Sequence, residues 1–517
     1  MKVAIVYPPH HHRRFSENLK VIDEEFVLAP PIILAYVAAV LERAGHEVLL
    51  LDAAALGLSR EDVSGRLRRF APDLLAFRLD TYNFQETLGW IKYLRFTTGV
   101  PVLVGGINLS LYPEETMAYE AIDYGIIGEA LDTLPLFLRS LKDAGPLRDI
   151  PGLCWKDAAG AVRINPPAGC LTDFDDYPYP ARHLLPNGKY RSFVSQRRNY
   201  TVMLTSTGCP YKCSFCAIAG LNHYRERSWE SVIGEIEECY HKYGIREIDF
   251  FDATFFINKP RCRRLFAEIR RRGLDITWTC RTRVDVVDED ILRAAAAAGC
   301  RMIFWGIESS SQEVLDGVNK GIRREQTAAA IRMAQGLGIR NLGFLMIGNP
   351  GETAETVRET MRFVKSIGLD YVQICRTIAK PGSALHRRLA RETGYDYWKE
   401  FIAGKVGEER LPAPWVGMEQ RQVEDLLKRA YYGFYFRPSF ILRTLLRTRS
   451  LDELLRYIRV GIRMIFHYFH TDVAATKDSV IVNRVAHWKL RPDAKPAAAD
   501  VPKIGGLRPA RRLNREA

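Results

Sequence analysis

Short apolar runs alternate with amphipathic segments over the first 140 residues of the chain. The runs that we expect to form strands lie at 3–7, 48–51, 74–77, 102–104 and 124–127, and residues 32–43 have helical periodicity. This alternation predicts a doubly wound, Rossmann-like α/β domain over residues 1–140. Because Tyr7-Pro8-Pro9 stands where a G-x-G-x-x-G turn would follow the first strand, a dinucleotide ligand is not expected.

A second alternating series occupies residues 199–395. Its apolar runs lie at 202–205, 247–251, 276–279, 302–305, 342–347 and 371–374, and helical patterns such as the one at 289–298 separate them. Six successive strand–helix units predict a partial (βα)6 barrel of the TIM type. Since parallel barrels carry their chemistry at the C-terminal strand ends, we expect the functional residues on that rim.

Three further segments complete the expected organisation. Residues 141–198 are punctuated by prolines and are predicted to form an irregular linker. Residues 396–485 are predicted to form a C-terminal helical region, in which apolar positions at 451–469 recur at helical spacing with arginines between them. Residues 486–517 are rich in Ala, Pro and Arg and are predicted to be disordered.

Composition narrows the setting in which the protein works. With 47% hydrophobic residues, the 517-residue chain has enough apolar surface for several cores. Neither a secretory leader nor a run long enough to span a bilayer is seen, and both findings favour a cytoplasmic location. The net charge of +13 is concentrated at the C-terminal end, where 20 Lys and Arg face 9 Asp and Glu from residue 421 onward. A basic end of this kind suits nucleic acid, an anionic membrane or an acidic substrate.

Three of the ten cysteines fall within eight positions. Cys209, Cys213 and Cys216 have the spacing C-x-x-x-C-x-x-C directly after the first barrel strand. Thiolates are soft ligands for iron–sulfur clusters or zinc, and three cysteines on a four-iron cluster leave one iron open to a chelating molecule. A zinc site needs a fourth ligand, for which His223 is the nearest candidate, but the wide gap argues against a compact finger.

This motif, with Phe215 before its last cysteine, resembles the signature of the radical S-adenosylmethionine (SAM) superfamily. The resemblance implies a [4Fe-4S] cluster whose open iron is chelated by the amino and carboxylate groups of SAM. It also implies cleavage of SAM to a 5′-deoxyadenosyl radical that removes hydrogen from a substrate. A flavodoxin or ferredoxin is the kind of electron donor that such an enzyme uses.

The same resemblance extends to other residues of the expected barrel rim. It implies that Asp252 contacts the methionine end of SAM, that Glu308 and Ser309 contact the cofactor from the fourth strand, and that Gly348 belongs to a glycine-rich segment near adenine. Arg283 is a candidate for bidentate contact with the SAM carboxylate. For each of these residues a structural salt bridge or a turn is the alternative.

The N-terminal domain resembles the cobalamin-binding domain that precedes the barrel in one branch of the superfamily. The positions that carry this resemblance are Pro30, Gly105, Gly106, Gly128 and Glu129, of which the last four follow expected strands. The Asp-x-His-x-x-Gly motif that supplies a cobalt-ligating histidine in other cobalamin proteins is absent, so no axial ligand is assigned. The histidines at 10–12 also follow a strand and lie where a corrin could be near, but a solvated loop is the favoured explanation for them.

Two activities are consistent with this resemblance. One is methylation of an unactivated carbon or phosphorus in a small-molecule or lipid-like substrate, and the alternative is an anaerobic oxidative cyclase of the porphyrin ester type. A tRNA methylthiotransferase carries three more cluster cysteines in its N-terminal domain, whereas the first 150 residues here contain none, so a nucleic-acid substrate is not expected. The helix expected at 451–469 suits peripheral contact with an anionic membrane, or packing on the barrel with its arginines in solvent.

Overall fold

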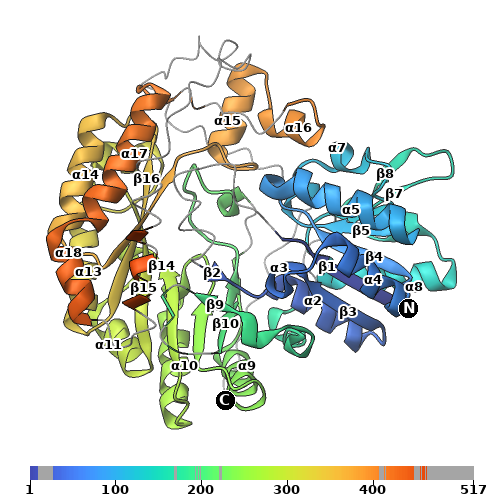
Figure 1. Cartoon of the computed structure of the whole chain (residues 1–517), viewed down its shortest axis with the longest axis horizontal. Coiled ribbons are helices and arrows are strands. Elements are labelled where there is room, and N and C mark those ends of the chain that lie inside the picture. The colour runs from blue at the N-terminus through green and yellow to red at the C-terminus, as the bar shows by residue number, and fades with distance from the viewer. Residues whose placement is uncertain are drawn as a thin grey trace, which may run out of the picture.

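The structure is a computed structural model, and it describes most of the chain up to residue 462. The described residues are 1–9, 27–167, 172–192, 194–195, 197, 199–220, 224–406, 413, 415–447, 454–455, 457–459 and 461–462. They form two α/β units that lie side by side (Figure 1). The histidines at 10–12, His223 and the tail predicted to be disordered at 486–517 lie outside the described residues.

The first unit is built on a seven-stranded sheet. In spatial order its strands are β3 (Glu47–Asp52), β1 (Lys2–Tyr7), β4 (Leu74–Arg78), β5 (Val102–Gly105), β6 (Tyr124–Ile126), β7 (Leu153–Lys156) and β8 (Val162–Ile164). The first five are parallel, and each of them overlaps a strand predicted from the sequence. The last two are antiparallel and form one edge of the sheet.

Different helices cover the two faces of this sheet. Val3 and Ile5 of β1 pack with α2 (Ile32–Arg43) and α8 (Ala130–Asp143). The alternate residues Ala4 and Val6 pack with α4 (Arg60–Phe70) and α5 (Phe84–Thr98). All four of these β1 side chains are buried, which is why the strand appears in the sequence as an unbroken apolar run. The doubly wound fold is therefore confirmed.

The segment at 141–198 is not wholly irregular, and the prediction of a linker there requires correction. It contributes β7 and β8, which form a hairpin around a turn in which the Asp157 carboxylate accepts from the backbone of Ala159 and Ala161. The hairpin pairs with β6 and so belongs to the first sheet. Strands of three or four residues are too short to give a clear hydrophobic period, and the flanking prolines masked them further.

The second unit is the predicted six-stranded partial barrel. Its sheet contains, in order, β10 (Tyr200–Met203), β13 (Glu247–Phe250), β14 (Thr277–Thr282), β15 (Cys300–Glu308), β16 (Arg340–Ile347) and β17 (Tyr371–Arg376). Every neighbouring pair is parallel. The connecting helices are α9 (Trp229–Lys242), α10 (Lys259–Arg271), α11 (Glu289–Ala297), α12 (Gln312–Gly317), α13 (Arg324–Gly336) and α14 (Ala354–Ser366).

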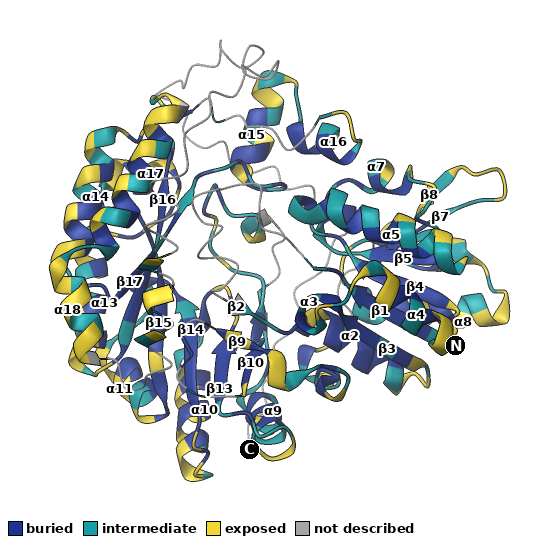
Figure 2. Ribbon diagram, viewed as in Figure 1, coloured by how far each residue is buried: buried dark blue, intermediate teal, exposed yellow. Residues whose placement is uncertain are grey.

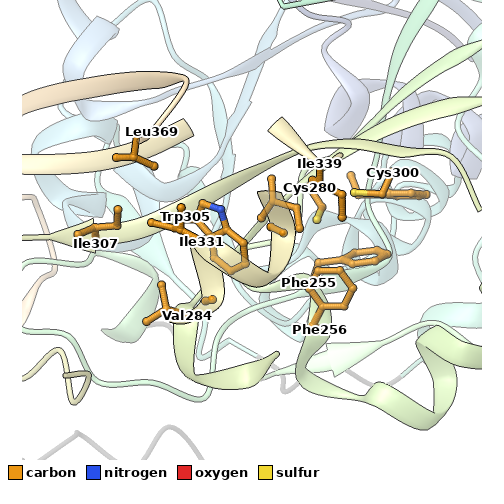
Figure 3. Close-up of a cluster of buried hydrophobic side chains, with 14 of the residues drawn as sticks. Phe255, Phe256, Cys280, Val284, Cys300, Trp305, Ile307, Ile331, Ile339 and Leu369 are labelled. Carbon is orange, nitrogen blue, oxygen red and sulfur yellow. The ribbon is translucent and has the colours of Figure 1, made fainter. Parts of the chain in front are cut away.

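A core lies between the barrel strands and the helices outside them. Phe255 stacks on Phe250 with 4.8 Å between ring centroids, and Phe266 stacks on Trp278 at 5.2 Å. Figure 3 shows part of this cluster, in which Trp305 also lies among aliphatic side chains of several elements. The strands are buried and the outward faces of the helices are exposed (Figure 2), as the helical periodicity predicted.

Two helices that follow the barrel pack on the first unit. Side chains of α15 (Ala384–Thr393) and α16 (Tyr397–Ile402), among them Leu385 and Trp398, belong to the same core as α5 of the first unit. Figure 1 shows both helices on the side of the barrel that faces the first domain. The boundary predicted at 395/396 falls between these two helices and therefore divides a single packed unit.

The last strand of the barrel sheet, β17, has no neighbouring strand among the described residues on its outer side, and α17 (Gln420–Tyr435) covers this edge. The hydroxyl of Tyr431 accepts from the Ile374 amide at 2.8 Å and donates to the carbonyl of the same residue at 3.0 Å. Tyr435 contacts the amide and the carbonyl of Val372 in the same way, at 3.1 and 2.6 Å. Two tyrosines thus replace the backbone partners that a seventh strand would offer to β17.

After α17 the chain continues in α18 (Pro438–Arg447), and the described residues of the helix predicted at 451–469 are also helical. No helix among the described residues is long and apolar enough to cross a membrane.

We expect Tyr431→Phe and Tyr435→Phe each to destabilise the edge of the barrel by about 1–3 kcal/mol, because each change leaves a buried N–H and C=O of β17 without a partner. Hydrogen exchange at the amides of Ile374 and Val372 should accelerate accordingly. Tyr432→Phe is the control, since the Tyr432 ring stacks on Phe436, a contact that phenylalanine keeps. Equal exchange in all three variants would refute the assignment.

Candidate functional site

The three motif cysteines lie in a loop at the C-terminal end of the first barrel strand. The loop follows β11 (Ser206–Thr207), which pairs with β12 (Arg225–Glu226) beyond the motif. Cys213 is buried, whereas Cys209 and Cys216 are half-buried, and all the cysteines of the described residues are free thiols. The loop therefore presents three thiols at the barrel mouth, where the sequence predicted them.

Backbone contacts fix this loop from both sides. The Ser214 amide donates to the Val318 carbonyl at 2.9 Å, and the Asn319 side chain donates to the Lys212 carbonyl at 2.9 Å. On the opposite side the Ser214 carbonyl accepts from the amide of Leu385, the second residue of α15, at 2.8 Å. The loop is thus held between the barrel and the helices that pack on the first unit.

The chemistry of the loop fits an iron–sulfur cluster better than a single metal ion. Among the described residues, no three His, Cys, Asp or Glu side chains converge closely enough to hold one ion. Thiolates that each bind a different iron of a cluster have no need to converge in this way. Burial raises the pKa of the Cys213 thiol, and the nearby Lys320 and Arg283 partly offset this increase. These cations favour the thiolate that iron binding requires.

Asp252, predicted as a cofactor contact, holds the start of the cysteine loop. Its carboxylate is buried and accepts from both the amide and the hydroxyl of Thr205, the amide at 2.7 Å. Burial raises the pKa of Asp252, and the contacts with Thr205 oppose that increase. Because both carboxylate oxygens bind protein groups, the described contacts favour the structural alternative for this residue.

The other predicted rim residues also have partners within the protein. Glu308 has a φ of +65°, which is unusual for any residue other than glycine. Its carboxylate accepts a hydrogen bond from Lys320 Nζ at 2.8 Å. The hydroxyl of Ser309 lies 3.2 Å from that of Thr360. Gly348 also has a positive φ, +89°, and its amide donates to the buried Glu352 carboxylate at 2.6 Å. Burial raises the pKa of Glu352 to about 7. Contact of Glu308, Ser309 and Gly348 with SAM stays a prediction.

The C-terminal edge of the first sheet carries glycines of two kinds, one required by packing within the protein and one with open space before it. Gly106 has a φ of +109°, and a Cβ at this position would lie 2.6 Å from the Leu79 carbonyl, so only glycine fits there. Gly128 has a φ of +83°, and a Cβ there would meet no atom within 4 Å. The preceding strand end at Gly105 accepts from the Leu79 amide, and Pro30 is buried at the start of α2. These residues fit the predicted cobalamin edge.

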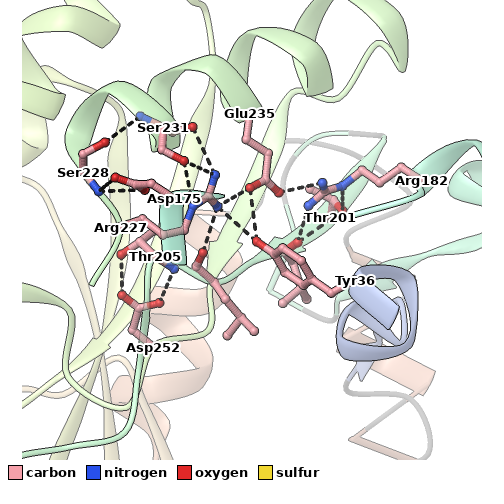
Figure 4. Close-up of polar contacts among 12 residues, drawn as sticks. Tyr36, Asp175, Arg182, Thr201, Thr205, Arg227, Ser228, Ser231, Glu235 and Asp252 are labelled. Carbon is pink, nitrogen blue, oxygen red and sulfur yellow. Dashed lines mark hydrogen bonds and ion pairs between the residues drawn. The ribbon is translucent and has the colours of Figure 1, made fainter. Parts of the chain in front are cut away.

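A buried charged network joins the first unit to the barrel (Figure 4). Glu235 of α9 is fully buried between Arg227 and Arg182, and Arg182 lies 2.6 Å from its carboxylate. Burial alone would raise the pKa of Glu235, but the two arginines hold it below its usual value. Arg227 also donates to the Tyr36 hydroxyl of α2 at 3.1 Å. Beside this network, the Glu129 carboxylate, predicted for the cobalamin site, binds Arg225 of β12.

A second set of contacts ties the first unit to α15 and α16. The Asp396 carboxylate binds His386 at 3.0 Å and accepts from the Tyr112 hydroxyl at 3.3 Å. Trp398 packs edge-on against Tyr82 with 5.2 Å between ring centroids. Tyr82 follows β4 at the C-terminal edge of the first sheet and also lies near Cys216. The cysteine loop and the predicted cobalamin edge therefore approach the same region between the two units.

Sequence reasoning did not identify Arg182, Glu235 or Lys320. Glu235 could have been found from the sequence, because it occupies a position of the apolar face of α9 between Val232 and Cys239. A charged residue on a buried face needs a buried partner. Arg182 and Lys320 could not have been predicted in this way, since their partners are distant in sequence or belong to a loop without periodicity.

The fold and the site together define a radical enzyme with a cluster loop and a second, cofactor-binding α/β domain. Residues 203–364 match the model of the radical SAM superfamily, and residues 23–138 match that of the B12 binding domain. The chain is 31% identical to an uncharacterized methyltransferase of Pyrococcus horikoshii over 86% of this chain and 94% of that protein. The protein therefore belongs to the cobalamin-binding radical SAM enzymes.

Other relatives agree with this assignment, and two solved structures share the fold. The chain is 26% identical to the cytidylyl-2-hydroxyethylphosphonate methyltransferase of Streptomyces wedmorensis, covering 78% of this chain and 86% of that one. It is also 26% identical to the anaerobic magnesium-protoporphyrin IX monomethyl ester cyclase of Rubrivivax gelatinosus, covering 85% and 78%. The fold resembles that of the radical SAM methyltransferase TsrM from Kitasatospora setae, with cobalamin and a [4Fe-4S] cluster bound (TM-score 0.60, 23% identity, 76% and 75% covered). It also resembles the cobalamin-dependent enzyme OxsB (TM-score 0.68, 17% identity, 90% and 72% covered).

These comparisons confirm the predicted family, its enzymatic nature and its cofactors, which are a [4Fe-4S] cluster, SAM and cobalamin. In this chain Cys209, Cys213 and Cys216 are the residues that would hold the cluster, and the glycine-lined edge of the first sheet is where cobalamin would lie.

We expect Gly128→Ala to weaken cobalamin binding by about tenfold or more while costing the cobalamin-free protein only about 1–2 kcal/mol, the penalty for a left-handed backbone. A methyl group there meets no protein atom and would meet only a ligand. Absorbance titration with hydroxocobalamin measures the affinity.

Gly160→Ala is the matched control for this experiment. Gly160 has a φ of +78° and equally open surroundings, but it lies in the β7–β8 turn at the opposite end of the sheet. Equal cobalamin affinity in the two variants would remove Gly128 from the site.

Proposed function

We propose that the protein methylates an unactivated carbon or phosphorus atom of a small-molecule or lipid-like metabolite. The observation that carries this proposal is the contact between the Ser214 carbonyl of the cysteine loop and the Leu385 amide of α15, a helix packed in the core of the first unit. This contact brings the cluster loop next to the domain that carries the second cofactor. Methyltransferases among the relatives, at 31% and 26% identity, support the same activity.

The chain contributes placement to this reaction. When bound, the cluster with SAM supplies a radical that removes hydrogen, and cobalamin supplies a methyl carrier. The cysteine loop is fixed by Asp252 through Thr205 and by backbone contacts on either side, so its thiols keep one geometry. On the inner side of the barrel, Phe251 is about half exposed and packs on the guanidinium of Arg281 at 4.0 Å. We assign the substrate site to the mouth of the barrel, between Phe251 and the first unit.

The alternative function is an anaerobic oxidative cyclase with the same cofactors. The relative from Rubrivivax gelatinosus, which is matched over 85% of this chain, supports it. The two reactions leave different products, since methylation adds a methylene unit to the substrate, whereas cyclisation removes hydrogen or adds oxygen.

The deciding experiment is anaerobic reconstitution with iron, sulfide and cobalamin, followed by SAM and reduced flavodoxin or ferredoxin as the proposed electron donor. We expect both 5′-deoxyadenosine and S-adenosylhomocysteine, as a methyltransferase would form. Deoxyadenosine without S-adenosylhomocysteine, with cobalamin bound, would favour the cyclase instead.

The control for this experiment is Cys216→Ala, which removes one cluster ligand and should abolish both products while cobalamin still binds. Absence of both products from the wild-type protein with a complete cluster would contradict the proposed function.

We further propose that the protein works in the cytoplasm against an anionic membrane, with α18 on the membrane surface. Four apolar side chains of this helix are exposed, namely Ile441, Leu442, Leu445 and Leu446 at 45, 60, 54 and 78%. In the segment that follows, Leu455, Ile458 and Ile462 are exposed apolar residues as well, and Arg459 is exposed beside them in the sequence. Exposed leucines beside arginines are typical of helices that lie in the headgroup region.

We expect the pair of changes Leu442→Gln and Leu446→Gln to lower binding to vesicles of phosphatidylglycerol and phosphatidylcholine by at least about tenfold, because two apolar anchors are lost. Co-sedimentation measures the partition. Phe96→Gln is the control, since Phe96 is 90% exposed but stands on the first unit. If the wild-type protein does not bind these vesicles, the membrane proposal is wrong.

A further inference from the structure

The surroundings of two of the motif cysteines, Cys213 and Cys209, differ. Cys213 is buried, and the Nη1 atom of Arg283 lies 3.8 Å from its sulfur, within range of a hydrogen bond to sulfur. Lys320 is a second buried cation near this thiol. The sulfur of Cys209, in contrast, lies 3.9 Å from the neutral hydroxyl of Thr254. Cationic surroundings are thus found at Cys213 but not in the described contacts of Cys209.

The guanidinium of Arg283 is fixed on every side. Its Nε and Nη2 atoms donate to the two carboxylate oxygens of Asp285 at 2.9 and 2.8 Å. Its plane lies over the ring of Tyr211 with 3.8 Å between the central carbon and the ring centroid, and only 5% of the residue is exposed. With two of its three nitrogens on Asp285, the remaining nitrogen is directed at the Cys213 sulfur.

We propose that Arg283 donates a hydrogen bond to the cluster ligand Cys213 and thereby raises the reduction potential of the cluster. One-electron reduction adds a negative charge to the cluster, and a buried cation that donates to a ligand sulfur stabilises the more negative state. Arg283 then acts as a positioning residue through Cys213 rather than by contact with SAM. This inference rests on the cluster that the family carries and is independent of which substrate is methylated.

The test is a redox titration of the reconstituted protein without SAM, in which electron paramagnetic resonance measures the fraction of reduced cluster. We expect Arg283→Gln to lower the ratio of reduced to oxidised cluster at a fixed potential by about tenfold, which corresponds to a midpoint shift of about 59 mV for one electron. Arg283→Lys keeps the charge without the planar fork, so its midpoint should lie between those of the glutamine variant and the wild type.

Arg281→Gln is the matched control. Arg281 lies two residues earlier, is bound by both oxygens of Asp249 at 2.7 and 3.0 Å and packs on an aromatic ring, as Arg283 does. Its described contacts include no cysteine of the motif. We therefore expect its midpoint to equal that of the wild type.

Iron and sulfide content are measured in each variant, so that only fully loaded protein is compared. An unchanged midpoint in Arg283→Gln, or an equal shift in Arg281→Gln, would overturn the proposal. An unchanged midpoint together with weaker SAM binding would overturn it in favour of contact with the SAM carboxylate. If Arg283→Gln does not load its cluster, the midpoint of Arg283→Lys is the test instead. A midpoint equal to that of the wild type in Arg283→Lys would refute the proposed hydrogen bond from the planar guanidinium.

Discussion

The structure depends on one buried carboxylate with two arginines. Glu235 is 0% exposed, and such a charge is tolerated only when opposite charges surround it. Arg182 comes from the segment that connects the two units, and Arg227 comes from the strand end beyond the cysteine motif. Because Tyr36 of the first unit joins the same network, loss of either arginine would leave the Glu235 charge incompletely compensated at the junction of all three segments.

Placement of the two cofactor sites follows from this junction. The network fixes one side of the interface, and the contacts of Asp396 with His386 and Tyr112 fix another. Between them lie the cysteine loop and the edge of the first sheet that carries Gly128. Contacts on two sides of the interface thus hold the two edges beside one another, and a reaction that uses both cofactors on one substrate requires such placement.

Elements with strong periodicity could be predicted from the sequence, and long-range pairings could not. All eleven predicted parallel strands are present, because strands buried on both faces appear as apolar runs whatever their neighbours are. The hairpin β7–β8 was missed because its strands are too short to show a period. The packing of α15 and α16 on the first unit was missed for another reason, since their partners lie nearly 300 residues earlier in the chain.

The site residues divide along the same line. The cysteines were found because their spacing is itself the signal, whereas the side chains around them have partners that spacing does not reveal. Thr279 and Arg281 of β14 and Arg283, which directly follows the strand, occupy alternate positions of extended chain, and this spacing by itself suggests a row of groups ready for an anionic ligand. In the structure Asp249 binds the first two and Asp285 binds the third. The charge of this row is therefore largely neutralised before any ligand binds, and its remaining effect is short-ranged and falls on the sulfur that Arg283 contacts.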